Sequence, residues 1–395
     1  MINQKFLGML SNKSVIRELS EYATARGKEI GYENVFDFSL GNPSVPAPQS
    51  FTDAAIRLLR EKEPLALHGY SPSLGLPDVK KTIAESLNRR FGMNYQDIHI
   101  FPTSGAAGAI AHAVRAVASI DEEIIVIAPF FSEYVPYIET CAKVRIVPAD
   151  FEAFQINFEA LRETLNENTA AILINSPNNP SGVVYSEETL TRLAAMLDEA
   201  SEKYGHRIFL ISDEPYREIA FDGKQVPYTA KFYDHTLTCY SFSKSLSVPG
   251  ERIGYVAVNP ACEQADKIVP MCGQISRGIG HNCPSSLIQM AVAEAIDDTS
   301  DLSVYEKNMN LLYDAFTDLG FSVIRPGGTF YIMPKALEED AVAFCKKALK
   351  YDLIFVPGDG FRAPGYFRVA YCIDTEKVER AIPVLRRFVQ EEYGK

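Results

Sequence analysis

The sequence predicts an α/β protein built on a mostly parallel sheet. Between residues 124 and 258, short apolar runs alternate with helical patterns, and such continuous runs are typical of strands buried on both faces. The runs cover residues 124–128, 170–174, 207–211 and 255–258. A helical apolar stripe over residues 190–197 lies between two of them. Beyond about residue 290 the alternation gives way to longer helical segments, which indicates a second, smaller α+β unit.

We therefore expect two domains. The chain has 395 residues, of which 47% are hydrophobic, enough for more than one compact unit. A large domain is expected over residues 46–293, and a small domain over residues 1–45 and 294–395. The small domain would combine an N-terminal helix over residues 11–30 with C-terminal elements. These are helices near 287–296 and 305–319 and strands near 321–324, 327–332 and 367–371.

Composition excludes several classes of function. The net charge is −12 and lysine and arginine form no block, so nucleic acid and anionic membranes are poor candidate partners. An 18-residue apolar run and a cleavable leader pattern are both missing, which predicts a soluble, cytoplasmic protein. The seven cysteines form no C-x-x-C pair and the six histidines are dispersed, so we expect neither a disulfide framework nor a metal site.

Two turns precede the alternating region. Residues 35–40 alternate as in a strand and run into a turn at Gly41, where a missing side chain lets the main chain approach a bound carboxylate closely. A plain strand-ending turn fits the same composition. Residues 68–77 are rich in turn formers and precede a helix with apolar residues 79, 83 and 87 on one face. Tyr70 lies in this turn, and a buried turn tyrosine is the alternative to a functional role for it.

Residues 98–119 suggest a strand, a turn of small residues and an alanine-rich helix. Gly105, Ala106 and Ala107 would expose the first N–H groups of that helix, and unpaired N–H groups together with the helix dipole favour a phosphate. The same composition also occurs where a helix simply packs tightly on a sheet. Since alanine has no hydroxyl group, any grip here must come from backbone amides.

Other candidate ligands follow the apolar runs. Phe131 comes after the first run, Asn179 after the second, and Asp213 and Tyr216 after the third. Carboxyl ends of parallel strands share one edge, where α/β proteins bind ligands, so these side chains are expected to meet. Phe131 could stack on a flat heteroaromatic ring. Taken singly, a core aromatic, a turn asparagine and a helix cap explain Phe131, Asn179 and Asp213 equally well.

The stretch over residues 241–254 has the strongest chemical character. Lys244 lies between small hydroxyl residues, and its amine could attack a carbonyl group to form a Schiff base. Ser241, Ser243 and Arg252, eight positions after the lysine, could hold an anionic group of the same molecule. Alone, Lys244 would be read as a surface lysine in a serine-rich loop.

Taken together, these motifs resemble the class I/II pyridoxal-phosphate-dependent aminotransferases, which are fold type I enzymes of the aspartate aminotransferase superfamily. The matching motifs are S-P-N-N-P-S-G at 176–182, D-E-P-Y at 213–216, S-F-S-K at 241–244 and R-I-G at 252–254. The resemblance covers nearly the whole chain. Departures are Ser176, where relatives often have asparagine, phenylalanine at the stacking position, and alanines where many relatives have a hydroxyl residue.

The resemblance implies pyridoxal 5'-phosphate (PLP) as the cofactor, held by Lys244 as an internal aldimine. Asp213 would pair with the protonated ring nitrogen, Asn179 and Tyr216 would donate to the phenolate oxygen, and Arg252 would bind the phosphate group. The cofactor-binding residues that it implies are Tyr70 of the partner subunit, Gly105, Ala106, Ala107, Phe131, Asn179, Asp213, Tyr216, Ser241, Ser243, Lys244 and Arg252.

It also implies an L-amino acid and a 2-oxo acid as substrates of a homodimer with shared active sites. The α-carboxylate would bind Arg368, with Gly41 and Asn179, although a structural ion pair would also explain an arginine in an apolar strand. Relatives specific for dicarboxylic amino acids have an arginine from the other subunit at about the position of Arg277. An aspartate-like donor is therefore favoured, while a solvated arginine is the alternative for Arg277.

Other functions stay open on the same residues. A carbon–sulfur β-lyase or a decarboxylase would keep every cofactor residue named above. A non-catalytic ligand-binding homologue is a more distant alternative. Loss of the lysine would be the signature of such a protein, and Lys244 is present.

Overall fold

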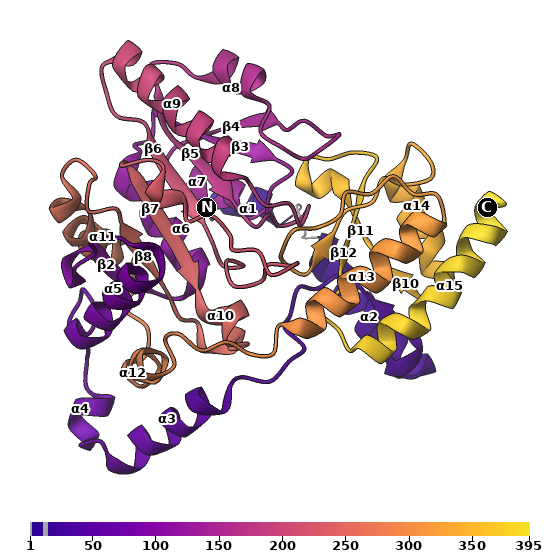
Figure 1. Ribbon diagram of the computed structural model, residues 1–395, viewed down its shortest axis with the longest axis horizontal. Helices are drawn as coiled ribbons and strands as arrows, with labels where there is room; N and C mark the ends of the chain where they lie inside the picture. The colour runs from indigo at the N-terminus through magenta and orange to yellow at the C-terminus, as the bar shows by residue number, and fades with distance from the viewer. Residues whose placement is uncertain (1, 11–14) are drawn as a thin grey trace.

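The computed structural model, which describes residues 2–10 and 15–395, contains a seven-stranded sheet in the order β2-β8-β7-β6-β5-β3-β4 (Figure 1). Its strands are β2 (Ile100–Thr103), β3 (Glu123–Ala128), β4 (Lys143–Pro148), β5 (Thr169–Asn175), β6 (Phe209–Asp213), β7 (Thr236–Ser241) and β8 (Gly254–Val258). Pairs from β4 through β7 are parallel, whereas β8 is antiparallel to β7 and β2. The predicted α/β class with a mostly parallel sheet is confirmed.

All four apolar runs lie on strands of this sheet, and two further strands escaped prediction. β7 carries Thr236, Thr238 and Ser241, so its sequence lacks an apolar run, yet every residue of the strand is buried. β4 lies at the edge of the sheet and exposes side chains such as Arg145. Composition therefore predicted the strands that consist of apolar residues. The strands with more polar residues, β4 and β7, are recognised only from their pairing with neighbouring strands in the sheet.

Helices cover both faces of the sheet. Along β3, Ile124 and Val126 pack with α6 and α11 on one face, while Ile125 and Ile127 pack with α8 and α9 on the other. Successive residues of a strand face opposite sides of the sheet, and helices cover both sides here. Residues 124–128 are therefore all apolar. The covering helices are α6 (Gly105–Val117), α7 (Tyr134–Glu139), α8 (Phe158–Thr164), α9 (Glu187–Tyr204) and α11 (Ala265–Ile279).

A further cluster of helices packs against the β2–β8 side of the sheet. Buried residues of α3, α5 and α12 form one hydrophobic cluster with β7 and β8. The helix predicted after residue 77 is α5, which begins at a proline in its first turn and ends at Gly92 with φ 68°. These and the neighbouring short helices are α1 (Gln4–Met9), α3 (Gln49–Glu61), α4 (Pro64–His68), α5 (Pro77–Phe91), α10 (Phe242–Ser245) and α12 (Ser286–Glu294).

Residues 303–395 form a smaller group of elements, on the right in Figure 1, with α2 beside it. The helices are α2 (Val15–Ile30), α13 (Ser303–Asp318), α14 (Ala341–Ala348) and α15 (Thr375–Tyr393). The strands are β1 (Phe36–Asp37), β9 (Tyr331–Ile332), β10 (Leu353–Ile354), β11 (Val356–Pro357) and β12 (Phe367–Ala370). They pair as β1-β10 and β11-β12-β9.

Several expectations for this group need correction. Residues 321–324 are not a strand, because Phe321 instead packs into the aromatic cluster of Phe316, Phe344 and Phe367. The strands expected over residues 35–40 and 327–332 shrink to β1 and β9. The expected helix over residues 11–30 is described only from Val15, since residues 11–14 lie outside the described part of the chain. The domain boundaries at residues 45/46 and 293/294 stay a prediction.

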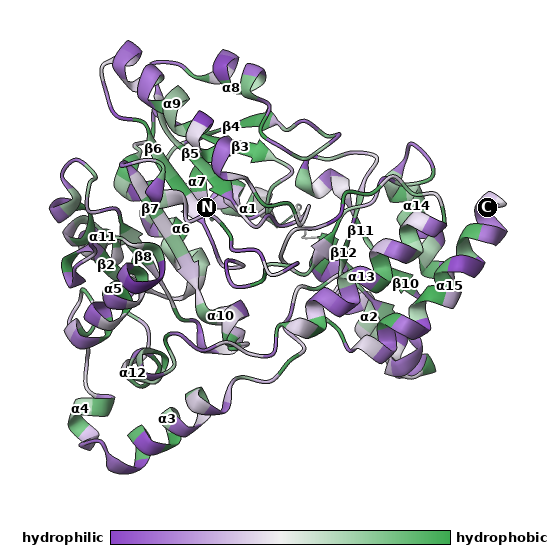
Figure 2. Cartoon of the chain, in the orientation of Figure 1, coloured by the Kyte–Doolittle hydropathy of each residue, from purple (hydrophilic) through white to green (hydrophobic). Residues whose placement is uncertain are grey.

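Hydropathy follows these layers in Figure 2, where the central strands are green and the outer helix surfaces carry purple. Fully buried isoleucines such as Ile124, Ile125 and Ile172 each contribute roughly 1.5–3 kcal/mol of burial free energy.

None of the helices in the described part of the chain is long and apolar enough to cross a membrane. The cytoplasmic location stays a prediction.

Candidate active site

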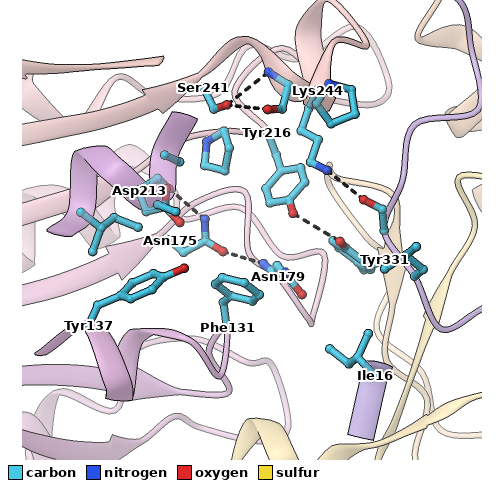
Figure 3. Close-up of a pocket in the computed structure, with 18 of the residues that line it drawn as sticks. Ile16, Phe131, Tyr137, Asn175, Asn179, Asp213, Tyr216, Ser241, Lys244 and Tyr331 are labelled. Atoms are coloured by element: carbon cyan, nitrogen blue, oxygen red, sulfur yellow. Dashed lines mark hydrogen bonds between the residues drawn. The ribbon is translucent and has the colours of Figure 1, made fainter. Parts of the chain in front are cut away.

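A cavity of about 260 Å³ lies between the carboxyl ends of the central strands and the smaller group of elements (Figure 3). The predicted residues that line it are Gly41, Ala106, Ala107, Phe131, Asn179, Asp213, Tyr216, Ser241, Ser243, Lys244, Arg252 and Arg368. Segments more than 300 residues apart in the sequence thus meet at the strand edge where ligands were expected. Gly105, Tyr70 and Arg277 do not line the cavity.

Lys244 reaches the cavity because a short helix begins at the end of β7. Ser241 is the last residue of that strand, and its Oγ accepts a hydrogen bond from the Ser243 backbone N–H at 3.2 Å, capping α10. The Lys244 Nζ donates to the carbonyl oxygen of Gly41 at 2.8 Å. Loss of hydration, together with the smaller effect of the charges of Arg252 and Arg368, lowers the pKa of Lys244 to about 8. Roughly a tenth of this amine is therefore neutral at pH 7, far more than for an ordinary lysine, and the neutral form can attack a carbonyl group.

Asp213 ends β6 and is only 4% exposed. Its Oδ2 accepts a hydrogen bond from the hydroxyl group of Tyr134, while its Oδ1 has no partner among the described residues. Burial raises the pKa of Asp213 to about 7. Asn175 donates its side-chain amide to the Asp213 carbonyl at 2.8 Å and so fixes the backbone there. A buried carboxylate oxygen that faces a cavity without a donor is suited to a cationic ligand group.

The start of α6 forms an anion cradle with Arg252. Gly105 has a φ of 71°, and a Cβ atom built there would lie 2.9 Å from Nη2 of Arg252, so a side chain would fill the cradle. Ser104, the N-cap residue of α6, makes no side-chain capping bond, which leaves first-turn N–H groups for a ligand. Arg252 is held by the carbonyl oxygens of Pro249 at 3.0 Å and Ser104 at 3.3 Å.

Arg368 is a buried cation, 2% exposed, and among the described residues no carboxylate pairs with it. It donates to Oδ1 of Asn179 at 3.0 Å and to the carbonyl oxygen of Ser39 at 2.6 Å, and it lies over the rings of Tyr331 and Phe361. Its Nε has no partner within residues 2–10 and 15–395. The ion pair considered as an alternative is thus missing from this described environment, and a buried guanidinium of this kind is suited to an anionic ligand.

Several cavity residues were missed by sequence reasoning. Tyr137 lies on α7, six positions after Phe131, and lines the cavity. Tyr134, three positions after Phe131, does not line the cavity but binds Asp213, which does. Tyr331 comes from β9, and its hydroxyl group is 3.3 Å from that of Tyr216. A Cβ atom at Gly41 would collide with that hydroxyl group, which gives Gly41 a packing reason to be glycine. The sequence offers no signal for such a contact between distant segments.

Tyr70 and Arg277 are both exposed and line a different groove, together with His68 and Asn282. This groove is separate from the cavity within one chain. Within one chain Tyr70 is fully exposed, so the alternative of a buried turn tyrosine does not fit it there. Any contact of these two residues with a bound cofactor or substrate requires a second chain.

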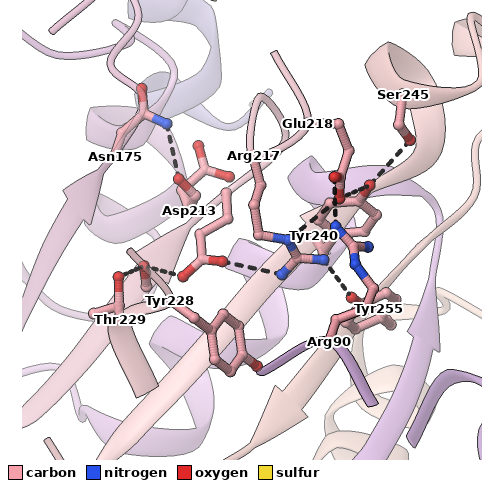
Figure 4. A network of polar contacts seen from close by, with 12 residues as sticks. Arg90, Asn175, Asp213, Arg217, Glu218, Tyr228, Thr229, Tyr240, Ser245 and Tyr255 are labelled. Atoms are coloured by element: carbon pink, nitrogen blue, oxygen red, sulfur yellow. Dashed lines mark hydrogen bonds and ion pairs between the residues drawn. The ribbon is translucent and has the colours of Figure 1, made fainter. Parts of the chain in front are cut away.

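A buried polar network supports the site from behind (Figure 4). Arg217 donates to Glu214 at 3.1 Å, to Glu218 at 3.4 Å and to the hydroxyl group of Tyr255 at 3.1 Å. Tyr240 links Glu218 to Ser245, the residue that follows Lys244. Since Glu214 follows Asp213, the network joins the backbone segments that carry the carboxylate and the amine.

The residues present fit PLP. A carboxylate oxygen without a donor, an amine with a lowered pKa, and an anion cradle at a helix start lie in one cavity. With the seven-stranded sheet, they define the class of fold type I PLP-dependent enzymes.

The chain belongs to the aminotransferase class I and II family, whose model matches residues 33–385. Enzymes of this family use PLP and transfer amino groups. The aspartate aminotransferase of Bacillus subtilis is 30% identical over 93% of this chain and 95% of its own length. An aminotransferase crystal structure from Eubacterium rectale is 42% identical, covers 100% of both chains and has a TM-score of 0.97. The aspartate aminotransferase structure from Thermotoga maritima is 26% identical, with a TM-score of 0.86 over 96% of this chain and 97% of its own.

Proposed function

We propose that this aminotransferase acts as a homodimer and takes the amino group from an L-amino acid with a dicarboxylic, aspartate-like side chain, passing it to a 2-oxo acid. The observation that carries the proposal is a grouping of three groups in one cavity. They are the Lys244 amine, Oδ1 of Asp213 and the guanidinium of Arg368; among the described residues Oδ1 has no hydrogen-bond donor and the guanidinium has no carboxylate partner. These groups are the minimum needed to hold PLP, protonate or deprotonate the substrate, and fix its carboxylate.

The cofactor would be held by Lys244 at its aldehyde carbon, by Asp213 at its ring nitrogen and by Asn179 and Tyr216 at its phenolate oxygen. Its phosphate group would lie at the start of α6, with donors from Ser241, Ser243, Arg252 and the N–H groups after Gly105. Phe131 lines the same cavity and offers a ring for stacking. When bound, PLP withdraws electrons from the substrate and so makes its Cα proton acidic.

Lys244 moves the proton. With the cofactor bound, its Nζ would be the group that takes the proton from the substrate Cα and gives a proton back on the cofactor side. The lowered pKa of Lys244 allows both steps near neutral pH, because its amine gains and loses a proton there. The net reaction would convert the amino donor into a 2-oxo acid and a second 2-oxo acid into an amino acid.

Arg368 orients the substrate. Its guanidinium group presents two donors to the α-carboxylate from a position between two aromatic rings, and Asn179 holds the guanidinium from the other side. Gly41 has no side chain, so its backbone can approach the same carboxylate. A side chain at this position would collide with the hydroxyl group of Tyr331. This arrangement fixes the Cα–H bond relative to Lys244.

The choice of a dicarboxylic donor depends on the second carboxylate. Lys244, Arg252 and Arg368 are the lysine and arginine side chains among the described cavity-lining residues, and each already has a role. A further cation would have to come from the partner, and Arg277 shares an exposed groove with Tyr70. Relatives about 30% identical are named aspartate aminotransferase and aspartate/prephenate aminotransferase, which supports the same choice.

A panel of amino donors with 2-oxoglutarate and pyruvate as acceptors tests the proposal on the purified, PLP-loaded protein. We expect turnover with aspartate or glutamate, and none with Lys244→Ala. Arg277→Ala should raise KM for dicarboxylic donors and leave apolar donors unchanged. Release of pyruvate and ammonia without an acceptor would identify a β-lyase instead, and release of CO₂ a decarboxylase.

A further inference from the structure

We propose that the hydroxyl group of Tyr137 binds the phosphate group of PLP and supplies the donor that the alanines at the start of α6 lack. The inference rests on the proposed function, specifically on the anion cradle at Gly105 and Arg252. It adds a residue from α7 to that cradle.

Tyr137 enters the cavity from the side of α7. It lines the cavity together with Ala106, Ala107 and Ile110 of α6 and with Arg252. Figure 3 shows its ring beside Phe131, with the hydroxyl end directed into the cavity. A tyrosine that served only as packing would bury its ring and place its hydroxyl group against a protein acceptor or in open solvent.

The hydroxyl group has a free donor. Within residues 2–10 and 15–395, Tyr137 makes no side-chain hydrogen bond, and Oδ1 of Asp213 is also without a partner, so the phenol does not donate to that carboxylate. Burial raises the pKa of Tyr137 to about 12, with Glu133 and Asp213 raising it and Arg252 lowering it. The phenol therefore keeps its proton across the working pH range and can donate it to a ligand.

The neighbouring tyrosine shows how α7 is used. Tyr134 lies one helical turn earlier, on the same side of α7, and its hydroxyl group is bound to Asp213. Tyr134 thus serves the carboxylate that faces the ring nitrogen. Tyr137, next along the helix, lies near both Asp213 and Arg252, whose charges act on its phenol.

The phosphate group is the acceptor that best matches this donor. Its oxygens carry the negative charge that Arg252 neutralises, and a hydrogen bond from a hydroxyl group to a charged oxygen is stronger than one to a neutral atom. Ala106 and Ala107 contribute N–H groups but no hydroxyl. Since Tyr137 lines the same cavity as these alanines, its phenol can take the place of that hydroxyl group.

The test compares how tightly the full-length apo protein binds PLP and pyridoxal, the form of the cofactor without a phosphate group. Dissociation constants for PLP and for pyridoxal, which lacks the phosphate group, are measured by absorbance for wild type and Tyr137→Phe. We expect Tyr137→Phe to weaken PLP binding roughly 10- to 100-fold, the range for a hydrogen bond to a charged group, and pyridoxal binding less than about 2-fold. Inorganic phosphate should compete with PLP less effectively in the variant.

Matched variants separate the possible failures. Tyr22→Phe, an exposed position on α2, controls for handling and should bind PLP as wild type does. If Arg252→Met weakens PLP but Tyr137→Phe does not, the role of Tyr137 is wrong and the cradle stands. If Tyr137→Phe weakens PLP and pyridoxal equally, the phenol acts at the ring and the inference is also overturned. If wild type binds PLP no tighter than pyridoxal, the cradle itself, and with it the proposed function, fails.

Discussion

The hydroxyl group of Tyr134 donates a hydrogen bond to Oδ2 of Asp213, while Oδ1 of the same buried carboxylate has no partner in the described chain. One oxygen is thus fixed by the protein and the other faces the cavity. Burial removes the hydration of the carboxylate and, with the nearby charge of Glu214, raises its pKa to about 7, although the hydrogen bond from Tyr134 lowers it. The site is built for a bound positive charge at the expense of the stability of the empty protein.

Asp213→Asn should stabilise the apo protein. The folded-state pKa of Asp213 is raised from 3.8 to about 7, so the folded state binds more protons than the unfolded state between these values, and stability falls as pH rises through this window. We expect the apo variant to gain roughly 1–3 kcal/mol over wild type at pH 8, with the gain vanishing near pH 4. Urea unfolding of both apo proteins at each pH measures this. An equal gain at both pH values would contradict the pKa argument.

The reactivity of Lys244 should follow its lowered pKa. Only the neutral amine attacks an aldehyde, and half of Lys244 is neutral at about pH 8 instead of at its ordinary value of 10.5. The rate of imine formation between the apo protein and pyridoxal should therefore rise with pH and level off above about pH 8. Stopped-flow absorbance between pH 6 and pH 10 gives the profile. A rate that still climbs tenfold per pH unit at pH 9 would show an ordinary lysine.

Arg368→Lys should reduce substrate binding more than cofactor binding. Lysine cannot present two parallel donors to a carboxylate, and the variant also loses the bond to Asn179. We expect kcat/KM for amino acids to fall about 30- to 150-fold, corresponding to about 2–3 kcal/mol, with the dissociation constant of PLP within about 2-fold of wild type. An amine donor without an α-carboxylate is the control, and it should be affected little. An equal loss of kcat/KM with that amine would show that Arg368 does not bind the α-carboxylate.

Mixed dimers should show whether Tyr70 acts across subunits. Tyr70 is fully exposed in one chain and lies outside its cavity, so a shared site would pair Lys244 of one chain with the tyrosine of the other. Lys244→Ala and Tyr70→Ala proteins, each nearly inactive, are mixed after mild denaturation. Random pairing gives one intact site in half of the dimers, hence about a quarter of wild-type activity. Tagged chains verify that hybrids form, and inactive hybrids would contradict shared sites.

Arg217→Met should destabilise the fold strongly. The substitution leaves Glu214 and Glu218 buried without their guanidinium partner, and removing one member of a buried ion pair costs roughly 3–5 kcal/mol. Arg162→Met is the matched control, because its pair with Glu199 is exposed and should contribute no more than about 1 kcal/mol. Denaturant unfolding of the PLP-loaded proteins gives both values. Similar losses for the two variants would show that the network in Figure 4 is not a support of the site.

The sequence predicted correctly those features that depend on residues close together in the chain. Apolar runs predicted the strands β3, β5, β6 and β8, and the order of short motifs pointed to a family that the comparisons bear out. It failed where a residue is buried by neighbours far away in the chain. β7 is polar in composition but lies between β6 and β8, and Phe321 leaves its expected strand for an aromatic cluster.

The sequence by itself determined the class of fold and the residue types that could hold a phosphorylated, aldehyde-bearing cofactor, because periodicity and motif spacing depend on near neighbours. Only the tertiary structure decided that Tyr134 holds Asp213 and that Tyr137 lines the cavity. It also decided that Arg368 is buried and, within the described part of the chain, has no carboxylate partner. Burial and hydrogen bonding arise from contacts between segments tens to hundreds of residues apart. They also set the pKa values of Lys244 and Asp213, on which the proposed chemistry depends.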